Sequence, residues 1–194
     1  MIPFELTVLG SNAALPAFGR FPSAQVLQVS NRLYMIDCGE GAQVRLQKAD
    51  LRISRLRHIF ISHLHGDHFF GLIGLITSFS LNRRQEPLHV FGPPGLEEIL
   101  RVQLRHSNTQ LAFPLEIVEL QGENLRLIHQ DSEVEVFSFA LRHRIPTWGF
   151  LFREKERPLN LRPEQIQRYE LPVKALPGIK QGADFVSPDG KIIP

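Results

Sequence analysis

Residues 63 to 68, with the sequence HLHGDH, constrain the fold of this chain more than any other stretch. They place three imidazoles and a carboxylate directly after a short apolar run, and each of these groups is costly to bury without a partner. Zinc supplies such a partner, because it accepts imidazole nitrogen and carboxylate oxygen as ligands. His63 and His65 can point the same way from an extended segment, whereas Asp67 and His68 begin the next element. The spacing therefore predicts two adjacent metal ions.

A solvated or packed histidine cluster is the alternative interpretation of the same motif. The cluster, however, lies between the apolar run Ile59 to Ile61 and a second apolar run from Phe69 to Leu81. This position indicates a strand-to-helix junction inside a fold, where Gly66 lets the backbone turn between the two sets of ligands. Metal binding is therefore the favoured interpretation.

The composition is that of a globular domain: the chain has 194 residues, of which 43% are hydrophobic and 22% charged. Cys38 is the only cysteine, which excludes an intramolecular disulfide and predicts a reducing, cytoplasmic compartment. The first nine residues lack the features of a signal peptide, and no apolar run reaches the length of a membrane span. We therefore expect no membrane association.

The remaining sequence predicts an α/β layered fold followed by a β meander. The expected strands are 4–9, 25–29, 33–36, 58–62, 88–91, 115–120, 125–129, 134–141 and 148–152, and the expected helices begin near residue 42 and span 69–81, 96–104 and 162–169. Asn31 is the expected turn residue of the first hairpin. Residues 171–182, which are rich in proline and glycine, predict an extended arm or loop.

Several polar residues outside the histidine motif are candidates for function. Asp37 ends an expected strand within the sequence DCGEG, whose glycines suggest a backbone that approaches another group closely, although Asp37 could instead cap the following helix. His143 follows the strand 134–141, a position from which a distant ligand can reach a metal ion, although a histidine at such a position is more often structural. His106 and His129 are better explained by structural roles, and the sequence does not decide whether Arg20 is functional or merely solvated.

With these pieces located, the chain resembles the metallo-β-lactamase superfamily and, within it, the ribonuclease Z family of transfer-RNA 3′-processing endonucleases. The resemblance rests on the loop 10–23, the sequence DCGEGAQ at 37–43, HLHGDH at 63–68, Gly92-Pro93 and HRIPTWGF at 143–150. It implies an α/β fold, the αββα sandwich of that superfamily, and a zinc-dependent endoribonuclease that cleaves the 3′ trailer from transfer-RNA precursors and leaves a 3′-hydroxyl.

The resemblance also assigns roles to individual residues. It implies that one zinc ion is bound by His63, His65 and His143, and the second by Asp67 and His68. Asp67 would in addition accept a proton during catalysis, and Asp37 would orient a ligating histidine. Manganese or iron could also occupy such a site.

The segment from Arg153 to Gly182 carries seven Lys or Arg and four Glu, so it offers a basic surface to a polyanion. Its position resembles that of the family's flexible exosite, which grips transfer RNA. Candidate RNA contacts are Lys155, Arg157, Lys174 and Lys180. The resemblance further implies precursor transfer RNA as the partner and a homodimer.

The chain departs from the family pattern toward its end, where the expected bridging aspartate and a further histidine are missing. Asp184 and Asp189 lie in arm and turn contexts and are not assigned to the bridge. We therefore expect an N-terminal part of a longer protein, divided into 1–152, a basic arm 153–182 and a return segment 183–194. Alone it would lack one α/β layer, expose apolar surface and bind the second zinc weakly.

Two other functions remain open at this point. A different hydrolase of the superfamily, such as a small-ester or cyclic-nucleotide phosphodiesterase, would share the histidines without needing the basic arm. A non-catalytic RNA-binding or assembly fragment would bind RNA without cleaving it.

Overall fold

The computed structural model describes residues 4–156, 160–187 and 190–193. The chain divides into two compact units, Met1–Glu154 and Lys155–Pro194, which are described separately below. The division of the chain at residues 152 and 182 that the sequence suggested stays a prediction.

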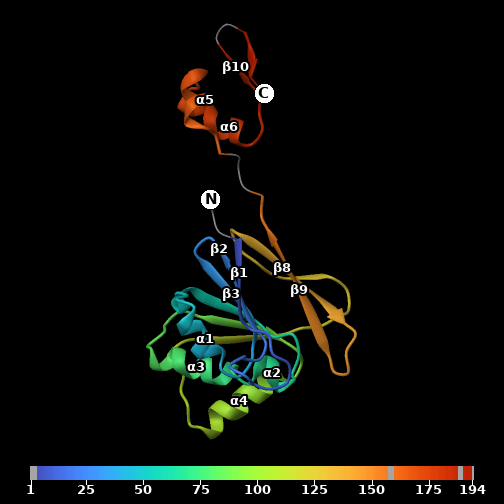
Figure 1. Cartoon of the computed structure of the whole chain (residues 1–194). Helices are drawn as coiled ribbons and strands as arrows, with labels where there is room; N and C mark the ends of the chain where they lie inside the picture. Colours follow the sequence, from blue (N-terminus) through green and yellow to red (C-terminus); the bar gives the residue numbers. More distant parts are fainter. Residues whose placement is uncertain (1–3, 157–159, 188–189, 194) are drawn as a thin grey trace. The chain divides into compact units, whose positions relative to one another are not determined.

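The first unit contains two β-sheets (Figure 1). The larger sheet has the strand order β1-β2-β3-β4-β5-β6, with β1 to β3 antiparallel and β3 to β6 parallel. Its strands are β1 (Phe4–Gly10), β2 (Ala24–Val29), β3 (Arg32–Cys38), β4 (Leu56–Phe60), β5 (Leu88–Gly92) and β6 (Leu115–Glu119). The smaller sheet is an antiparallel meander of β7 (Arg126–Gln130), β8 (Val134–Leu141) and β9 (Thr147–Glu154).

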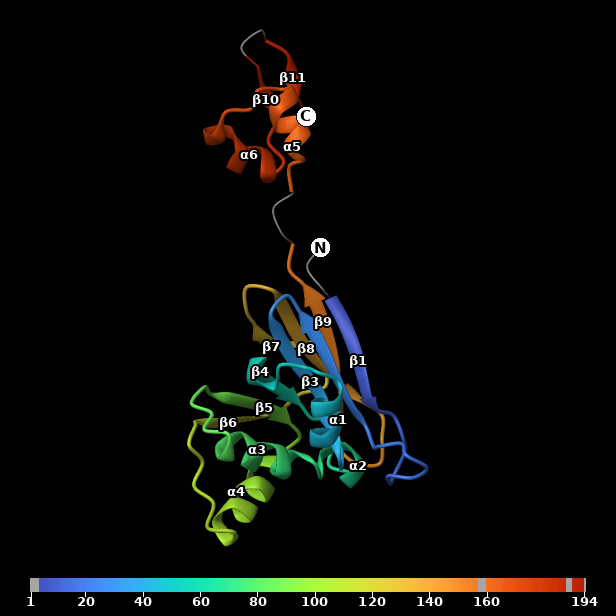
Figure 2. The ribbon, with the colours of Figure 1, turned by 60° about the vertical axis from the view of Figure 1, so that its left-hand side comes forward.

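Helices cover one face of the larger sheet, and the smaller sheet packs on the other (Figure 2). The helices and short turns of this unit are α1 (Ala42–Lys48), η1 (Ile53–Arg55), α2 (Gly66–Phe69), α3 (Leu72–Leu81) and α4 (Leu96–His106). In α3 the buried residues Leu72, Leu75, Ile76 and Phe79 recur at helical spacing and pack against the sheet. Between the sheets lies a second core, to which Phe60 contributes. The layers are thus helix, sheet and sheet.

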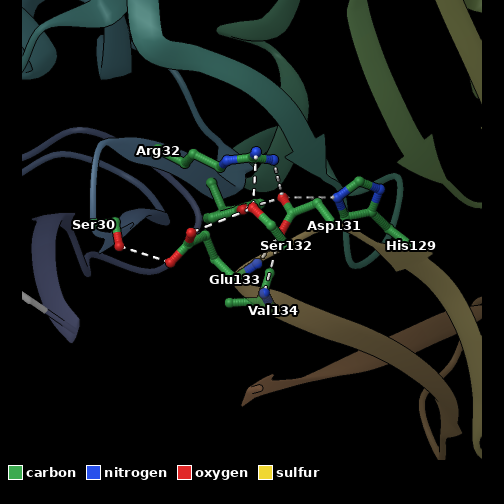
Figure 3. Close-up of polar contacts among 8 residues, drawn as sticks. Ser30, Arg32, His129, Asp131, Ser132, Glu133 and Val134 are labelled. Atoms are coloured by element: carbon green, nitrogen blue, oxygen red, sulfur yellow. Dashed lines mark hydrogen bonds and ion pairs between the residues drawn. The ribbon is translucent and has the colours of Figure 1, made fainter. Parts of the chain in front are cut away.

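The meander is also fastened to the larger sheet by a polar network around Asp131, in the turn after β7 (Figure 3). Its carboxylate accepts hydrogen bonds from Arg32 at 2.6 Å, from the Tyr34 hydroxyl, and from the backbone amides of Glu133 and Val134. Although burial opposes ionisation, these bonds, led by that of Tyr34, hold the pKa of Asp131 well below its usual range. The ionised Asp131 carboxylate, with its hydrogen bonds made, therefore links the two sheets.

His129 belongs to this structural network, as the sequence suggested. Its Nε2 lies 3.4 Å from the Asp131 carboxylate, and its ring centroid lies 4.0 Å from that of His58 on β4. His58 in turn stacks on His89 of β5, with 5.1 Å between centroids. The rings of His58 and His89 are stacked and those of His58 and His129 are tilted, and the three do not form a group of metal donors among the described residues, so we interpret them as packing.

One local prediction in this unit was wrong. The helix expected over 69–81 is two helices, because the Gly71 amide bonds to the Cys38 carbonyl at 2.9 Å and breaks the helical path between α2 and α3. In the β2–β3 hairpin the two turn residues are Ser30 and Asn31, which confirms the turn expected at Asn31; Ser30 has the positive φ, at 54°.

The second unit consists of short elements. They are α5 (Pro163–Arg168), η2 (Val173–Ala175), α6 (Leu176–Lys180), β10 (Phe185–Val186) and β11 (Ile192–Ile193), the last two forming an antiparallel pair. The prediction of an extended arm or loop over 171–182 was wrong, since most of that stretch is helical. Pro177 lies in the first turn of α6, where a missing amide hydrogen costs nothing, and Gly182 follows the helix with φ +88°.

The helices found in the described ranges are all too short, or too polar, for a bilayer crossing.

Candidate metal centre

Three histidines from two distant segments meet at the end of the parallel strands. His63 and His65 follow β4, and His143 lies in the turn between β8 and β9. Each offers a ring nitrogen, and these nitrogens lie within 4.8 Å of one another; the contact between His65 Nδ1 and His143 Nε2 is 3.4 Å. Within the described ranges this is the only such group of three or more His, Cys, Asp or Glu donors. The geometry brings together the three histidines that the sequence had singled out.

His63 is the buried member of the group. Its Nδ1 lies 3.0 Å from the Ser62 hydroxyl. Burial, followed by the proximity of His68, lowers the pKa of His63 to about 4. The ring is therefore neutral at physiological pH, which is the form that ligates metals.

Asp37 orients the neighbouring histidine from the end of β3. Its carboxylate accepts a hydrogen bond from His68 Nδ1 at 2.6 Å, from the Ser62 amide at 2.8 Å and from the Ser23 hydroxyl at 3.0 Å. Although burial opposes protonation of His68, the hydrogen bond to Asp37 outweighs it and raises the pKa of that imidazole. With the Nδ1 proton directed at Asp37, His68 Nε2 is left with its lone pair for a ligand.

Asp37 reaches these partners in a left-handed backbone conformation, with φ 56°. Such a conformation is uncommon outside glycine and is tolerated best by Asp and Asn. No side chain caps the N-terminus of α1, so the alternative role of Asp37 as a helix cap is wrong.

Asp67 lies on α2 beside His68, with 3.6 Å between its Oδ2 and His68 Nε2. The Ala14 amide donates to the same carboxylate oxygen at 2.9 Å. This bond and the nearby imidazole of His68 lower the pKa of Asp67 although its partial burial acts in the opposite direction. The carboxylate therefore stays ionised and adjacent to the lone pair of His68.

Two glycines allow this close packing. A Cβ at Gly39 would lie 2.4 Å from the Asp67 carbonyl oxygen, and one at Gly71 would lie 2.2 Å from the Gly39 carbonyl oxygen. The backbone after β3 thus lies directly against α2, which confirms the close approach that the DCGEG sequence suggested.

Several groups that position this site were missed by sequence reasoning. Ser23 and Ser62 are hydroxyl partners of the site, and Ala14 contributes only its backbone amide. Serines are too common to stand out in a sequence, and a backbone donor leaves no trace in it. Ser62, next to the first histidine, is the one that could have been found from its position.

The predicted RNA contacts belong to the second unit. Lys174 and Lys180 are exposed there and Lys155 is partly buried, while Arg157 lies outside the described residues.

The sandwiched sheets and the histidine cluster define a protein of the metallo-β-lactamase fold, and comparison with known proteins agrees. A family model described as "Anti-Pycsar protein Apyc1" matches residues 4–145. The metallo-β-lactamase-fold protein YhfI from Bacillus subtilis has a similar structure, with a TM-score of 0.59 and 17% identity, over 76% of this chain and 58% of that one. The chain therefore belongs to the family described as Anti-Pycsar protein Apyc1, and its structural likeness to YhfI shows the metallo-β-lactamase fold.

The resemblance to ribonuclease Z is confirmed by relatives that carry that name. Ribonuclease Z of Bacteroides thetaiotaomicron is 47% identical over all of this chain and 61% of its own length, and that of Bacteroides fragilis is 45% identical over all of this chain and 64% of its own. The short form of human tRNase Z superposes with a TM-score of 0.73 and 38% identity, over 78% of this chain and 66% of that one. The chain thus spans less than two thirds of these curated bacterial relatives.

Proposed function

We propose that this chain carries the metal-binding part of a zinc-dependent endoribonuclease that removes the 3′ trailer from transfer-RNA precursors and leaves a 3′-hydroxyl. The observation that supports it best is the convergence of His63, His65 and His143 beside the Asp67–His68 pair. The names of the relatives point to the same substrate.

The donor set fits two zinc ions. His63, His65 and His143 would hold one, and Asp67 and His68 would contribute to the second. When bound, such a pair of ions supplies a hydroxide at neutral pH and neutralises the charge that develops on a phosphodiester. Four imidazoles and one carboxylate are donors that zinc accepts readily.

The protein's own groups prepare this site. Asp37 fixes the ring of His68, and the Ala14 amide fixes one oxygen of Asp67. With Oδ2 held in this way, we assign to Asp67 the role of proton acceptor.

Recognition of the RNA body is assigned to the basic second unit. Exposed Lys174 and Lys180, together with Lys155 and Arg157, would contact phosphates, so the affinity would fall with salt and would not depend on base sequence. We also propose a cytoplasmic homodimer; the buried, unpaired Cys38 suits a reducing compartment.

The proposal is tested with a 5′-labelled precursor transfer RNA that carries a 3′ trailer, incubated with the 194-residue chain and zinc. We expect one cut at the trailer junction, a product that poly(A) polymerase extends from its 3′-hydroxyl, and loss of the cut in the His63→Ala variant. His106→Ala, an exposed histidine at the end of α4, is the matched control and should cleave normally. RNA binding without cleavage would instead support a non-catalytic RNA-binding fragment.

A second assay distinguishes the proposed endoribonuclease from a different phosphodiesterase of the same fold. The chain and a variant lacking residues 155–182 are compared on the precursor and on a small phosphodiester, bis(p-nitrophenyl) phosphate. Loss of precursor cleavage with retained hydrolysis of the small substrate supports the proposal. Equal effects on both substrates would contradict a role of the second unit in RNA recognition.

A further inference from the structure

An aromatic residue occupies an unfavourable position at the tip of the β1–β2 loop. Ala17 and Arg20 exchange two backbone hydrogen bonds, of 3.2 and 2.9 Å, so Phe18 and Gly19 are the central residues of a tight hairpin turn. Both have positive φ, 52° and 73°, as a type I′ turn requires. Asn, Asp and Gly are the usual residues at the first position, and a bulky side chain with positive φ is an outlier.

Among the described residues, Phe18 has no packing contact that would offset this strain. Its side chain is completely exposed, whereas Phe21 in the same loop packs against Gly41 and lies 5.7 Å from the Arg45 guanidinium. The backbone strain and the exposure of Phe18 are both unfavourable for stability. Backbone strain of this kind concentrates at functional sites, so Phe18 is a candidate for a contact outside the chain.

The loop is fixed to the candidate metal centre. The Ala14 amide donates to Asp67 at 2.9 Å, and the Asn12 amide bonds to the Phe21 carbonyl at 2.9 Å, closing the base of the loop. Both ribbon views show the loop beside α2, the helix that carries Asp67 (Figures 1 and 2). Phe18 is thus held on a short turn whose base is joined to the site.

Positive charge accompanies the aromatic ring. Arg20 is exposed next to the turn and lines a hollow of about 200 Å³ with Arg45. Arg142 and Arg144, also exposed, flank His143. In the part of the chain that the structure describes, none of Arg20, Arg142 and Arg144 pairs with a carboxylate. Phe18 and the unpaired Arg20 share one turn, and an aromatic face next to a guanidinium group is a combination that binds single-stranded nucleic acid.

We propose that Phe18 stacks on a nucleobase of the single-stranded RNA end that enters the metal centre, with Arg20 contacting an adjacent phosphate. The inference rests on the proposed function and adds a substrate-positioning contact to it. Because every base has an aromatic face, the contact positions the RNA end without selecting its sequence. A protein partner, including a second copy of this chain, is the competing occupant of this surface.

The test compares Phe18→Ala and Phe18→Trp with the wild-type chain. Leu15→Ala, an exposed aliphatic residue of the same loop, is the matched control. The RNA is a precursor with 2-aminopurine at the first trailer nucleotide, and a second RNA carries it in the anticodon loop. Affinity and 2-aminopurine fluorescence are measured in a chelator, so that the precursor stays uncut, and the mass of the chain in solution is measured for each variant.

Loss of one stacking contact predicts an affinity for the precursor about 5- to 150-fold weaker in Phe18→Ala. The fluorescence at the trailer position should be quenched by the wild-type chain and by Phe18→Trp but not by Phe18→Ala, and the anticodon-loop probe should respond equally to all. Normal affinity and quenching in Phe18→Ala overturn the inference while leaving the proposed function intact. A wild-type chain that does not bind the precursor overturns both, and a change only in mass assigns Phe18 to contact with a second copy.

Discussion

Replacing Asp37 with asparagine isolates the hydrogen bonds that orient His68. Asparagine has the same shape and tolerates the φ of 56° as well as aspartate does, so the backbone should be unaffected. The variant loses the charge on a group that accepts three hydrogen bonds, including that from His68 Nδ1 at 2.6 Å. Loss of such a partner of a metal-ligating histidine weakens metal binding by about 10- to 100-fold, or about 1.4 to 2.7 kcal/mol.

The same change should alter the pH dependence of stability in the metal-free protein. The pKa of His68 is raised in the folded state, so the stabilisation from its pairing with Asp37 is fully present below the unfolded value of about 6.5. It is lost as the pH rises through the raised value. Asp37→Asn should therefore destabilise the chelator-treated protein more at pH 6 than at pH 9.

Zinc affinity is measured by competition with a chelating indicator, and unfolding is followed by denaturant titration at both pH values. Asp50→Asn is the matched control, because Asp50 is exposed and also has a positive φ, 52°. Unchanged zinc affinity in Asp37→Asn, or a destabilisation as large in Asp50→Asn, would refute the reasoning.

Two further predictions concern packing and acid stability. The Cβ of Gly39→Ala would lie 2.4 Å from the Asp67 carbonyl oxygen, so this variant should destabilise the protein by about 1 to 3 kcal/mol in denaturant unfolding. Gly74→Ala in α3 is the control and should not destabilise it, because the nearest atom there is the end of the Gln43 side chain at 3.3 Å. Equal stabilities of the two variants would contradict the packing argument. Burial, followed by the nearby His129 and His89, lowers the pKa of His58 to about 3. Between about pH 6.5 and 3 the unfolded chain therefore binds a proton at His58 that the folded chain does not bind, so the free energy of unfolding should fall as the pH drops through this range. His58→Asn should flatten that part of the stability curve, measured by denaturant unfolding between pH 7 and 4, and a slope as steep as that of the wild type would show that another group is responsible.

Much of the site was predictable because its residues are adjacent in sequence. His63, His65, Asp67 and His68 lie in one turn, so a strand followed by a helix necessarily brings them together. The position of His143 after a strand made it a candidate, but only the family resemblance assigned it to the metal, because its approach to His65 depends on how the meander folds across the larger sheet.

The errors have physical causes of the same kind. The break between α2 and α3 depends on the bond from the Gly71 amide to Cys38, a contact across 33 positions that the local apolar pattern does not contain. The helix α6 was missed because proline suggested an extended arm, although proline is tolerated in the first turn of a helix. The stack of His58 and His129 depends on pairing between two sheets, and no local pattern marks it.

The most direct test of the central claim is zinc-edge X-ray absorption on the zinc-loaded chain and on its His143→Ala variant. The account predicts imidazole scattering at about 2.0 to 2.1 Å in the wild-type protein. In His143→Ala it predicts a lower imidazole count and weaker zinc binding, whereas His106→Ala should match the wild type. An unchanged imidazole count and unchanged affinity in His143→Ala would contradict the claim that the turn after β8 completes a metal centre begun by His63 and His65.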